Sequence, residues 1–188
     1  GLNDDTVIPV ITPRFVPTCT PALMKGLGKI AAHYQLPIQS HMGETVEEVA
    51  WVRELHQEST TYSDVYIKHG LMPKETTVYM AHCIHCGQME RELMKSQECG
   101  VVHCPNSNFT LGSGICNVRQ WIEEGHTVGM GTDVAGGYSP SMLDAIRNAR
   151  VASVAITQVN GKQNSKYIQD RRLSYSQLFY LATQGGAN

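Results

Sequence analysis

The sequence predicts an α/β fold of parallel strands alternating with helices, as in part of a (β/α)8 barrel. Short apolar, β-branched runs alternate with amphipathic segments of helical length, which is the pattern of βαβ units. Polar residues typical of active sites directly follow three of these runs. The chain has 188 residues, whereas a complete barrel needs about 250. We therefore expect residues 1–188 to form a single incomplete barrel domain and the chain to be a fragment.

The elements follow from apolar spacing and from end signals. Pro9 weakens the first strand, and Pro105 ends the fourth. T-x-x-E at Thr45 and S-x-x-Q at Ser174 are capping boxes that open helices. The predicted strands are 6–12, 36–40, 76–81, 100–104 and 127–132. The predicted helices are 20–34, 45–59, 63–69, 87–98, 117–124, 141–159 and 174–183, and 161–171 is a polar loop.

Helical spacing also predicts which helix faces are buried. The expected core positions are Leu23, Leu27, Ile30 and Ala31 in the first helix and Met142, Ile146, Ala149 and Ala152 in the long one. Five strands cannot close an eight-stranded barrel. Either the sheet is open and doubly wound, or three further units lie outside this chain.

Composition excludes several classes of partner. The net charge is −2, from 15 basic and 17 acidic residues, and no basic stripe is present, so we expect no nucleic-acid partner. The longest apolar runs have strand length, far below the roughly 20 residues of a membrane span. No signal-peptide pattern follows Gly1, and the six cysteines suit reduced thiols, so we expect a cytoplasmic protein.

Two histidines and two carboxylates after the predicted strands form the strongest candidate site. His41 and Glu44 lie in S-H-M-G-E, His82 in M-A-H-C and Asp133 in G-T-D. Imidazole and carboxylate groups bind divalent metals, and a further carboxylate can move protons. If the strands belong to one parallel barrel, all four side chains gather at its C-terminal rim. This pattern indicates a metal-dependent hydrolase.

Each of these residues also has a structural explanation. A histidine after a strand is more often a hydrogen-bonded structural residue, and Glu44 could simply favour a helix N-terminus. Cys83-x-x-Cys86 has zinc-knuckle spacing but lacks a second pair with matching spacing. His103, in H-C-P-N-S-N, is not expected to act directly, and its neighbours could make a turn or shape the rim.

Arg14 and Phe15 follow the first predicted strand at the same rim. A guanidinium and an aromatic ring suit a planar heterocycle that carries a carbonyl group. From the residues alone, a surface arginine beside a packed phenylalanine is the more common arrangement.

Taken together, the motifs resemble the amidohydrolase superfamily of metal-dependent (β/α)8 barrels. S-H-M-G-E, M-A-H-C, H-C-P-N-S-N and G-T-D are similar in order and surroundings to the ends of its fifth to eighth strands. T-P-R-F at 12–15 and G-T-D-V-A-G-G-Y-S-P-S-M-L-D-A-I-R at 131–147 resemble the branch that deaminates guanine. The resemblance implies a partial TIM barrel, about strands 4 to 8 with their helices. The implied reaction is hydrolytic deamination of guanine to xanthine and ammonia.

The resemblance also implies roles for the matching residues. His41 and Asp133 would bind one Zn²⁺, and His82 would contact the attacking water. Glu44 would shuttle the proton, and Asp133 would help to deprotonate the water. The implied purine-binding residues are Arg14, Phe15, His41, Met42, Gly43, Glu44 and Asp133.

The family's H-x-H pair, which supplies two more zinc ligands, does not occur in these 188 residues. We therefore expect those ligands outside the chain, and we expect the chain alone to be inactive. The resemblance implies a homodimer for the complete protein. Two alternatives stay open: another deaminase or chlorohydrolase of the superfamily, and an inactive truncated form that acts as an interaction partner.

Overall fold

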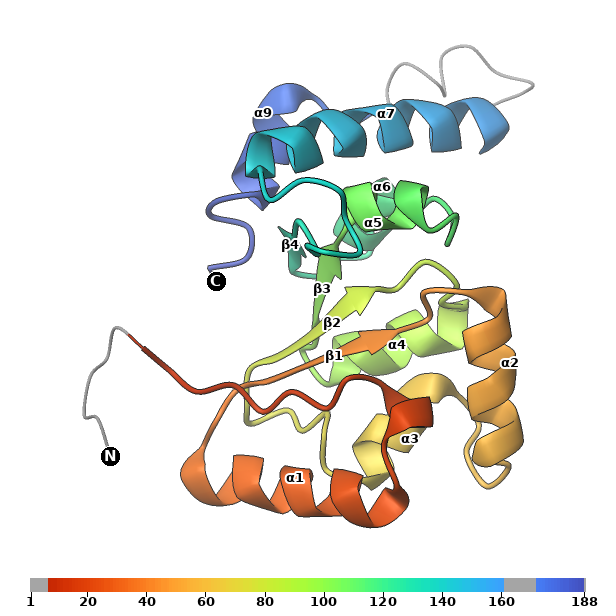
Figure 1. Cartoon of the computed structure of the whole chain (residues 1–188), viewed down its shortest axis with the longest axis vertical. Helices are drawn as coiled ribbons and strands as arrows, with labels where there is room; N and C mark the ends of the chain where they lie inside the picture. The colour runs from red at the N-terminus through yellow and green to blue at the C-terminus, as the bar shows by residue number, and fades with distance from the viewer. Residues whose placement is uncertain (1–6, 161–171, 188) are drawn as a thin grey trace.

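The computed structural model describes residues 7–160 and 172–187, and its centre is a parallel sheet (Figure 1). The strands, in the spatial order β1-β2-β3-β4, are β1 Ile38–Met42, β2 Val78–His82, β3 Gly100–His103 and β4 Val128–Met130. Each strand pairs in parallel with its neighbour. A doubly wound sheet reverses its strand order at a switch point, whereas a barrel keeps consecutive order. The sheet is thus a section of a barrel.

Helices connect and cover the strands. In Figure 1, α1, α2 and α3 gather beside β1, whereas α5, α6, α7 and α9 gather beyond β3 and β4. The capping boxes predicted at Thr45 and Ser174 are both present. The helices are η1 Val16–Thr18 (a 3-10 turn), α1 Pro21–Tyr34, α2 Val46–Leu55, α3 Tyr62–Lys68, α4 Gln88–Ser96, α5 Pro105–Thr110, α6 Val118–Glu123, α7 Met142–Asn160 and α9 Tyr175–Leu181.

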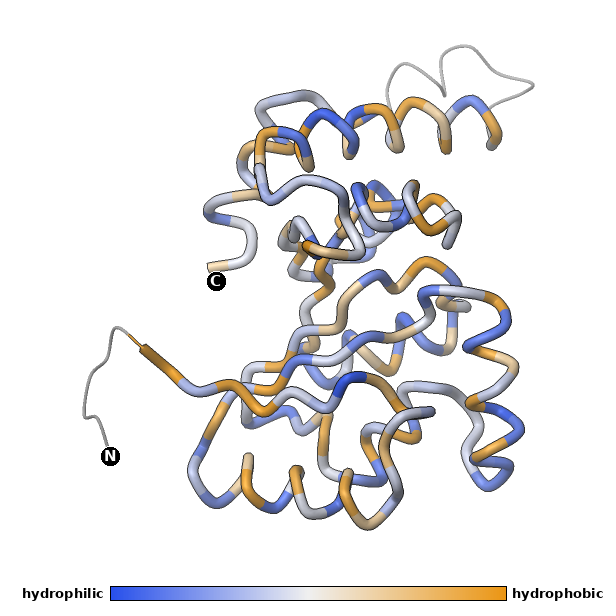
Figure 2. Tube along the Cα trace, in the orientation of Figure 1, coloured by the Kyte–Doolittle hydropathy of each residue, from blue (hydrophilic) through white to orange (hydrophobic). Residues whose placement is uncertain are grey.

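The first predicted strand, 6–12, is reduced to one bridge between Ile11 and Ile38. Residue 6 lies outside the described residues, and Pro9 has no N–H to donate to a ladder. Val7 and Ile8 are 69% and 61% exposed, and Figure 2 colours this segment as hydrophobic. The described residues therefore form four strands rather than five, with Ile11 marking the edge beside β1.

Two further predictions were wrong in detail. The helix predicted over 45–59 ends at Leu55. A short helix, α5, begins at Pro105, where we expected the end of a strand and a turn. Proline fits the first turn of a helix, since its missing N–H would be unpaired there anyway. The polar loop predicted over 161–171 lies outside the described residues.

The predicted core face of helix α1 is right at Ala31, which is buried, and at Leu27, which packs partly buried against the core, but wrong at its other two positions. Leu23 and Ile30 are 48% and 43% exposed, whereas Met24 and Gly28 are buried. A Cβ added to Gly28 would lie 2.4 Å from the carbonyl oxygen of His69, so this close approach admits only glycine. The predicted core positions Ile146, Ala149 and Ala152 of α7 are buried as expected.

The alternation along β1 decides which side chains can reach a site. Ile38, Ser40 and Met42 are buried in the core, whereas Gln39 is exposed and His41 is half-buried. His41 therefore points to the open face of the sheet, the face that lines the interior in a closed barrel. No helix in the described part of the chain has the length and apolarity to cross a membrane.

Candidate metal centre and active site

The side chains of His41, His82 and Asp133 converge beyond the C-terminal ends of β1, β2 and β4. One ligand atom from each lies within 4.8 Å of the others. The Nε2 atom of His82 is 3.8 Å from Asp133 Oδ2, and the His41 and His82 rings are stacked with centroids 5.3 Å apart. Ligands of a tetrahedral zinc ion with bonds near 2.1 Å lie roughly 3.4 Å apart. The group therefore needs only small adjustments to enclose such an ion.

Both histidines are oriented through Nδ1, which leaves Nε2 facing the group. His41 Nδ1 donates to the carbonyl oxygen of Arg14 at 2.7 Å. His82 Nδ1 is 2.9 Å from Asn108 Oδ1, which can only accept. The Nε2 atom of His82 is buried and has no hydrogen-bond partner. Metal-bound histidines typically donate their other ring nitrogen in this way, so the donor set fits a metal ion.

Unusual backbone geometry brings His82 and Asp133 to this position. By strand alternation His82 would share the buried side of Met42, its partner in the register. Its φ of 71° is left-handed, and so is the φ of 48° at Asp133. Such conformations cost about 1–3 kcal/mol for residues other than glycine and cluster at functional sites. The turn at His82 brings its ring against that of His41.

Glu44 lies beside the three residues. Its Oε2 atom is 3.7 Å from His82 Nε2, and its side chain is 21% exposed, so a small molecule could reach it. Its Oε1 atom accepts from the Ser113 hydroxyl at 2.9 Å. Its backbone N–H donates to Glu48 Oε2 at 2.9 Å, so the start of α2 anchors the residue. Glu44 can therefore exchange protons with a molecule bound at the metal group.

Of the predicted pair Arg14 and Phe15, the backbone of Arg14 contacts the site, because its carbonyl oxygen accepts from His41 Nδ1. The Arg14 guanidinium carbon lies 5.9 Å from the centre of the Phe15 ring, and the arginine is exposed. Gly43 has a left-handed φ of 58°, and a Cβ there would lie 3.2 Å from Cys86 Sγ. Gly43 therefore lets the chain turn tightly between His41 and Glu44.

Met42 is not brought to the rim, although it was predicted to line the pocket. Its side chain is fully buried in the core, where Ser63 Oγ donates to its Sδ at 3.6 Å. Adjacent residues of a strand point to opposite faces, so His41 and Met42 cannot both face the site.

His103 faces the helices instead of the metal group. It lines a small void with Ala149 and Ser153 of α7. Burial lowers its pKa to about 3, with a smaller contribution from His82, so the ring is neutral. All six cysteines are free, and the described residues contain no metal-binding group that includes a cysteine. The structure gives no support to a zinc knuckle at Cys83 and Cys86.

Two residues that contact the site were not singled out from the sequence. Asn108 occurs in the H-C-P-N-S-N stretch, which was noted only as a turn or rim segment. Ser113 contacts a residue 69 positions away, and no spacing pattern indicates that contact.

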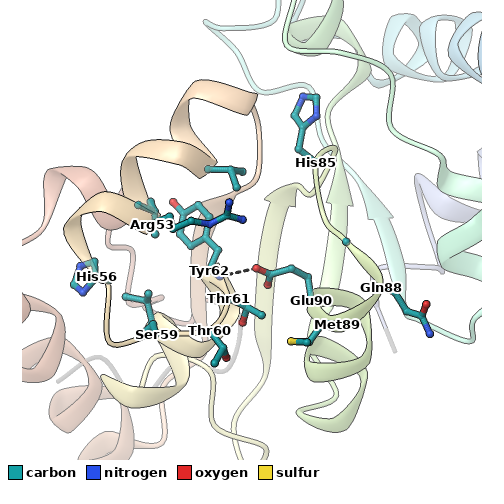
Figure 3. Close-up of a pocket in the computed structure, with 14 residues that line it drawn as sticks. Arg53, His56, Ser59, Thr60, Thr61, Tyr62, His85, Gln88, Met89 and Glu90 are labelled. Atoms are coloured by element: carbon teal, nitrogen blue, oxygen red, sulfur yellow. Dashed lines mark hydrogen bonds between the residues drawn. The ribbon is translucent and has the colours of Figure 1, made fainter.

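A separate cavity of about 270 Å³ lies outside this rim, between α2, α3 and α4 (Figure 3). Glu90 accepts from the backbone N–H groups of Tyr62 and Ser63 there, so its carboxylate caps the start of α3. Arg53 and His85 also line this cavity. None of the metal-group residues line it, so it is distinct from the candidate active site.

Comparison of the sequence and the structure with known proteins finds guanine deaminases among the similar proteins. The chain is 44% identical over 183 residues to a probable guanine deaminase of Schizosaccharomyces pombe, covering 97% of this chain and 33% of that protein. It superposes with a TM-score of 0.92 on a guanine deaminase from C. acetobutylicum with bound guanine in the active site, at 42% identity. That match covers 99% of this chain and 43% of the other.

A more distant structure shares the fold. An atrazine chlorohydrolase from Arthrobacter aurescens, complexed with zinc, matches with a TM-score of 0.78 at 22% identity, over 94% of this chain and 36% of the other. The chain spans about a third of the length of the curated relatives that it matches. The profile of the Amidohydrolase family matches residues 1–188, and this match, with the identity to the relatives, shows that the chain belongs to the amidohydrolase family.

Proposed function

We propose that the complete protein catalyses the zinc-dependent hydrolytic deamination of guanine to xanthine and ammonia. The observation that carries this proposal is the convergence of His41, His82 and Asp133, with Glu44 beside them. The similarity to a guanine deaminase with bound guanine supports the choice of substrate. The proposal concerns the complete protein because this chain spans only part of the length of its relatives.

His41, His82 and Asp133 are the residues that would hold the zinc ion, with further ligands from elsewhere in the complete protein. When bound, zinc lowers the pKa of a water molecule to about 7, which makes a nucleophile available at neutral pH. Asp133 accepts a proton from the attacking water. His82 Nε2 faces both carboxylates, which suits it to hold either the ion or the attacking water.

Glu44 moves the proton in the proposed reaction. Water adds to the ring carbon that carries the amino group, and Glu44 passes one proton of that water to a ring nitrogen. The other proton, taken up by Asp133, passes to the amino nitrogen, so that ammonia leaves and the remaining oxygen forms the carbonyl group of xanthine. The position of Glu44 Oε2, 3.7 Å from His82 Nε2 on a side chain that is 21% exposed, supports this role.

Replacing Glu44 tests the proton transfer. Glu44→Gln in the complete protein should keep its zinc but lose about 10²–10⁴-fold in guanine turnover, because glutamine cannot carry a proton. Asp133→Ala should lose turnover and part of the zinc. Xanthine formation and metal content measure these effects, with Glu47→Gln on the exposed face of α2 as the matched control. Near-normal turnover of Glu44→Gln would rule out the shuttle.

Arg14 is the residue expected to favour guanine over adenine. A guanidinium can donate to the 6-oxo group of guanine, whereas adenine offers an amine at that position. An unmet donor costs about 1–3 kcal/mol, or roughly ten- to a hundredfold in selectivity. Arg14→Met should therefore reduce the selectivity by this factor and weaken guanine turnover more than it weakens zinc binding. Arg53→Met, at an exposed arginine of α2, is the control, and unchanged guanine kinetics in Arg14→Met would remove Arg14 from the site.

The cellular setting and the oligomeric state are further parts of the proposal. Six free cysteines support a reducing compartment such as the cytoplasm. A homodimer stays a prediction from the family resemblance. Light scattering on the complete protein would show one subunit or two.

A further inference from the structure

We infer that Ser113 is a positioning residue for Glu44, holding Oε1 so that Oε2 is the oxygen presented to the reacting atoms. The inference rests on the proposed function, in which Glu44 transfers the proton. It assigns a role to a residue that has no place in the metal group.

The hydrogen bond between Ser113 and Glu44 is partly buried and joins the serine to one oxygen of the carboxylate. Ser113 is 6% exposed, and its Oγ donates to Glu44 Oε1 at 2.9 Å. The other oxygen, Oε2, lies on the side of His82, 3.7 Å from Nε2. Hydrogen bonds to an ionised group are short and strong, so the hydroxyl fixes the rotation of the carboxylate. One oxygen is thereby anchored and the other is left facing the metal group.

Ser113 is itself held by two contacts. His85 Nε2 donates to its carbonyl oxygen at 2.8 Å, and the Ser113 N–H donates to the carbonyl oxygen of Asn108 at 3.0 Å. Figure 3 shows His85 at the edge of the separate cavity between α2, α3 and α4, on the segment that follows β2. These two contacts fix the backbone of Ser113 at both its N–H and its carbonyl group, and so they fix the position from which the hydroxyl donates.

The segment from Asn108 to Ser113 connects two residues of the site. Asn108 orients His82, and Ser113 orients Glu44. Helix α5 and the turn after it thus align both side chains, although His82 ends β2 and Glu44 follows β1. Misplacement of a reacting group lowers the rate more than it weakens binding.

The test compares Ser113→Ala with Ser113→Thr in the complete zinc-loaded protein. Ser113→Ala should lower kcat for guanine about tenfold, because a hydrogen bond to a charged group is lost, and should change KM and zinc content less than about twofold. Ser113→Thr retains a hydroxyl and should restore most of kcat. Ser153→Ala is the control: this buried serine accepts from the Leu173 N–H at 2.7 Å in α7, and its loss should leave kcat unchanged.

A double-mutant cycle with Glu44→Gln separates positioning from general damage. If Ser113 acts through Glu44, Ser113→Ala should cost much less than tenfold in the Glu44→Gln background. The same loss in both backgrounds would overturn the inference, and so would an unchanged kcat in Ser113→Ala alone.

A crystal structure of Ser113→Ala gives a readout that does not depend on the substrate. The Glu44 carboxylate should rotate away from its present orientation, and an unmoved carboxylate would overturn the inference. Failure of the wild-type protein to deaminate guanine would instead overturn the proposed function, and the structural readout would still decide the role of Ser113.

Discussion

The ends of β2 and β3 look alike in sequence but differ in what they do. His82 and His103 are each the last residue of a short strand, and each is 1% exposed. His82 has one ring nitrogen bonded to Asn108 and the other facing two carboxylates. His103 has no partner on either nitrogen and lies against α7. Burial and position in a motif therefore do not identify a functional histidine; its partners do.

The physical difference begins in the backbone. His82 has a left-handed φ, which takes its ring out of strand alternation towards His41. His103 pairs in register with Met130 and has no such turn, so its ring stays on the side of the helices. There, desolvation keeps it neutral and inert.

The strongest test of this difference replaces each of the two histidines by a residue without an imidazole ring. His82→Ala in the complete protein should lower guanine turnover by about 10²–10⁴-fold, because the metal group loses one of its three members. His103→Leu should keep near-normal turnover. Steady-state kinetics and zinc content measure both variants, and equal losses would show that the two positions are not functionally different.

A smaller effect is expected from the partner of His82. Asn108→Leu removes the acceptor that orients the ring and should cost about 10–100-fold in zinc affinity or turnover. Asn148→Leu, which removes the donor to Asn106 Oδ1 instead, is the matched control and should cost much less. Zinc titration against a competing chelator would measure the affinity. If Asn108→Leu kept the zinc affinity and turnover of the wild type, the His82 ring would not need the hydrogen bond to Asn108 for its orientation.

The smallest effect is the contribution that His103 makes to the pH dependence of stability. Its folded-state pKa is about 3, below the unfolded value of about 6.5. The unfolded state therefore binds more protons as the pH falls below about 6.5, and folding loses up to about 1.4 kcal/mol per pH unit. Stability from this residue is complete above the unfolded pKa and is lost as the pH falls towards 3.

His103→Leu removes this proton linkage and leaves no unpaired ring nitrogen. The variant should be about as stable as wild type at pH 7 and gain about 2 kcal/mol over it by pH 5. Denaturant unfolding of both proteins at the two pH values measures the difference. A constant difference would show that His103 is protonated in the folded state or solvated.

The strands were largely predictable because their signal is local. All four named strands overlap predicted runs, since a buried parallel strand needs a short continuous apolar segment. The strand predicted over 6–12 is present only as the bridge at Ile11, and Pro9 had already indicated that this strand would be weak. The buried face of α1 was predicted at Leu27 and Ala31 but not at Gly28, because the close approach of the chain at His69 turns that side of the helix inward and leaves Leu23 and Ile30 exposed.

The sequence by itself determined the candidate group His41, Glu44, His82 and Asp133, because residues that follow parallel strands meet at one end of the sheet. Only the tertiary structure decided that Met42 points away and that Asn108 and Ser113 orient the site. Side-chain direction depends on strand alternation and on single left-handed residues. Contacts between Ser113 and Glu44, 69 positions apart, exist only once the chain has folded, and no local pattern encodes them.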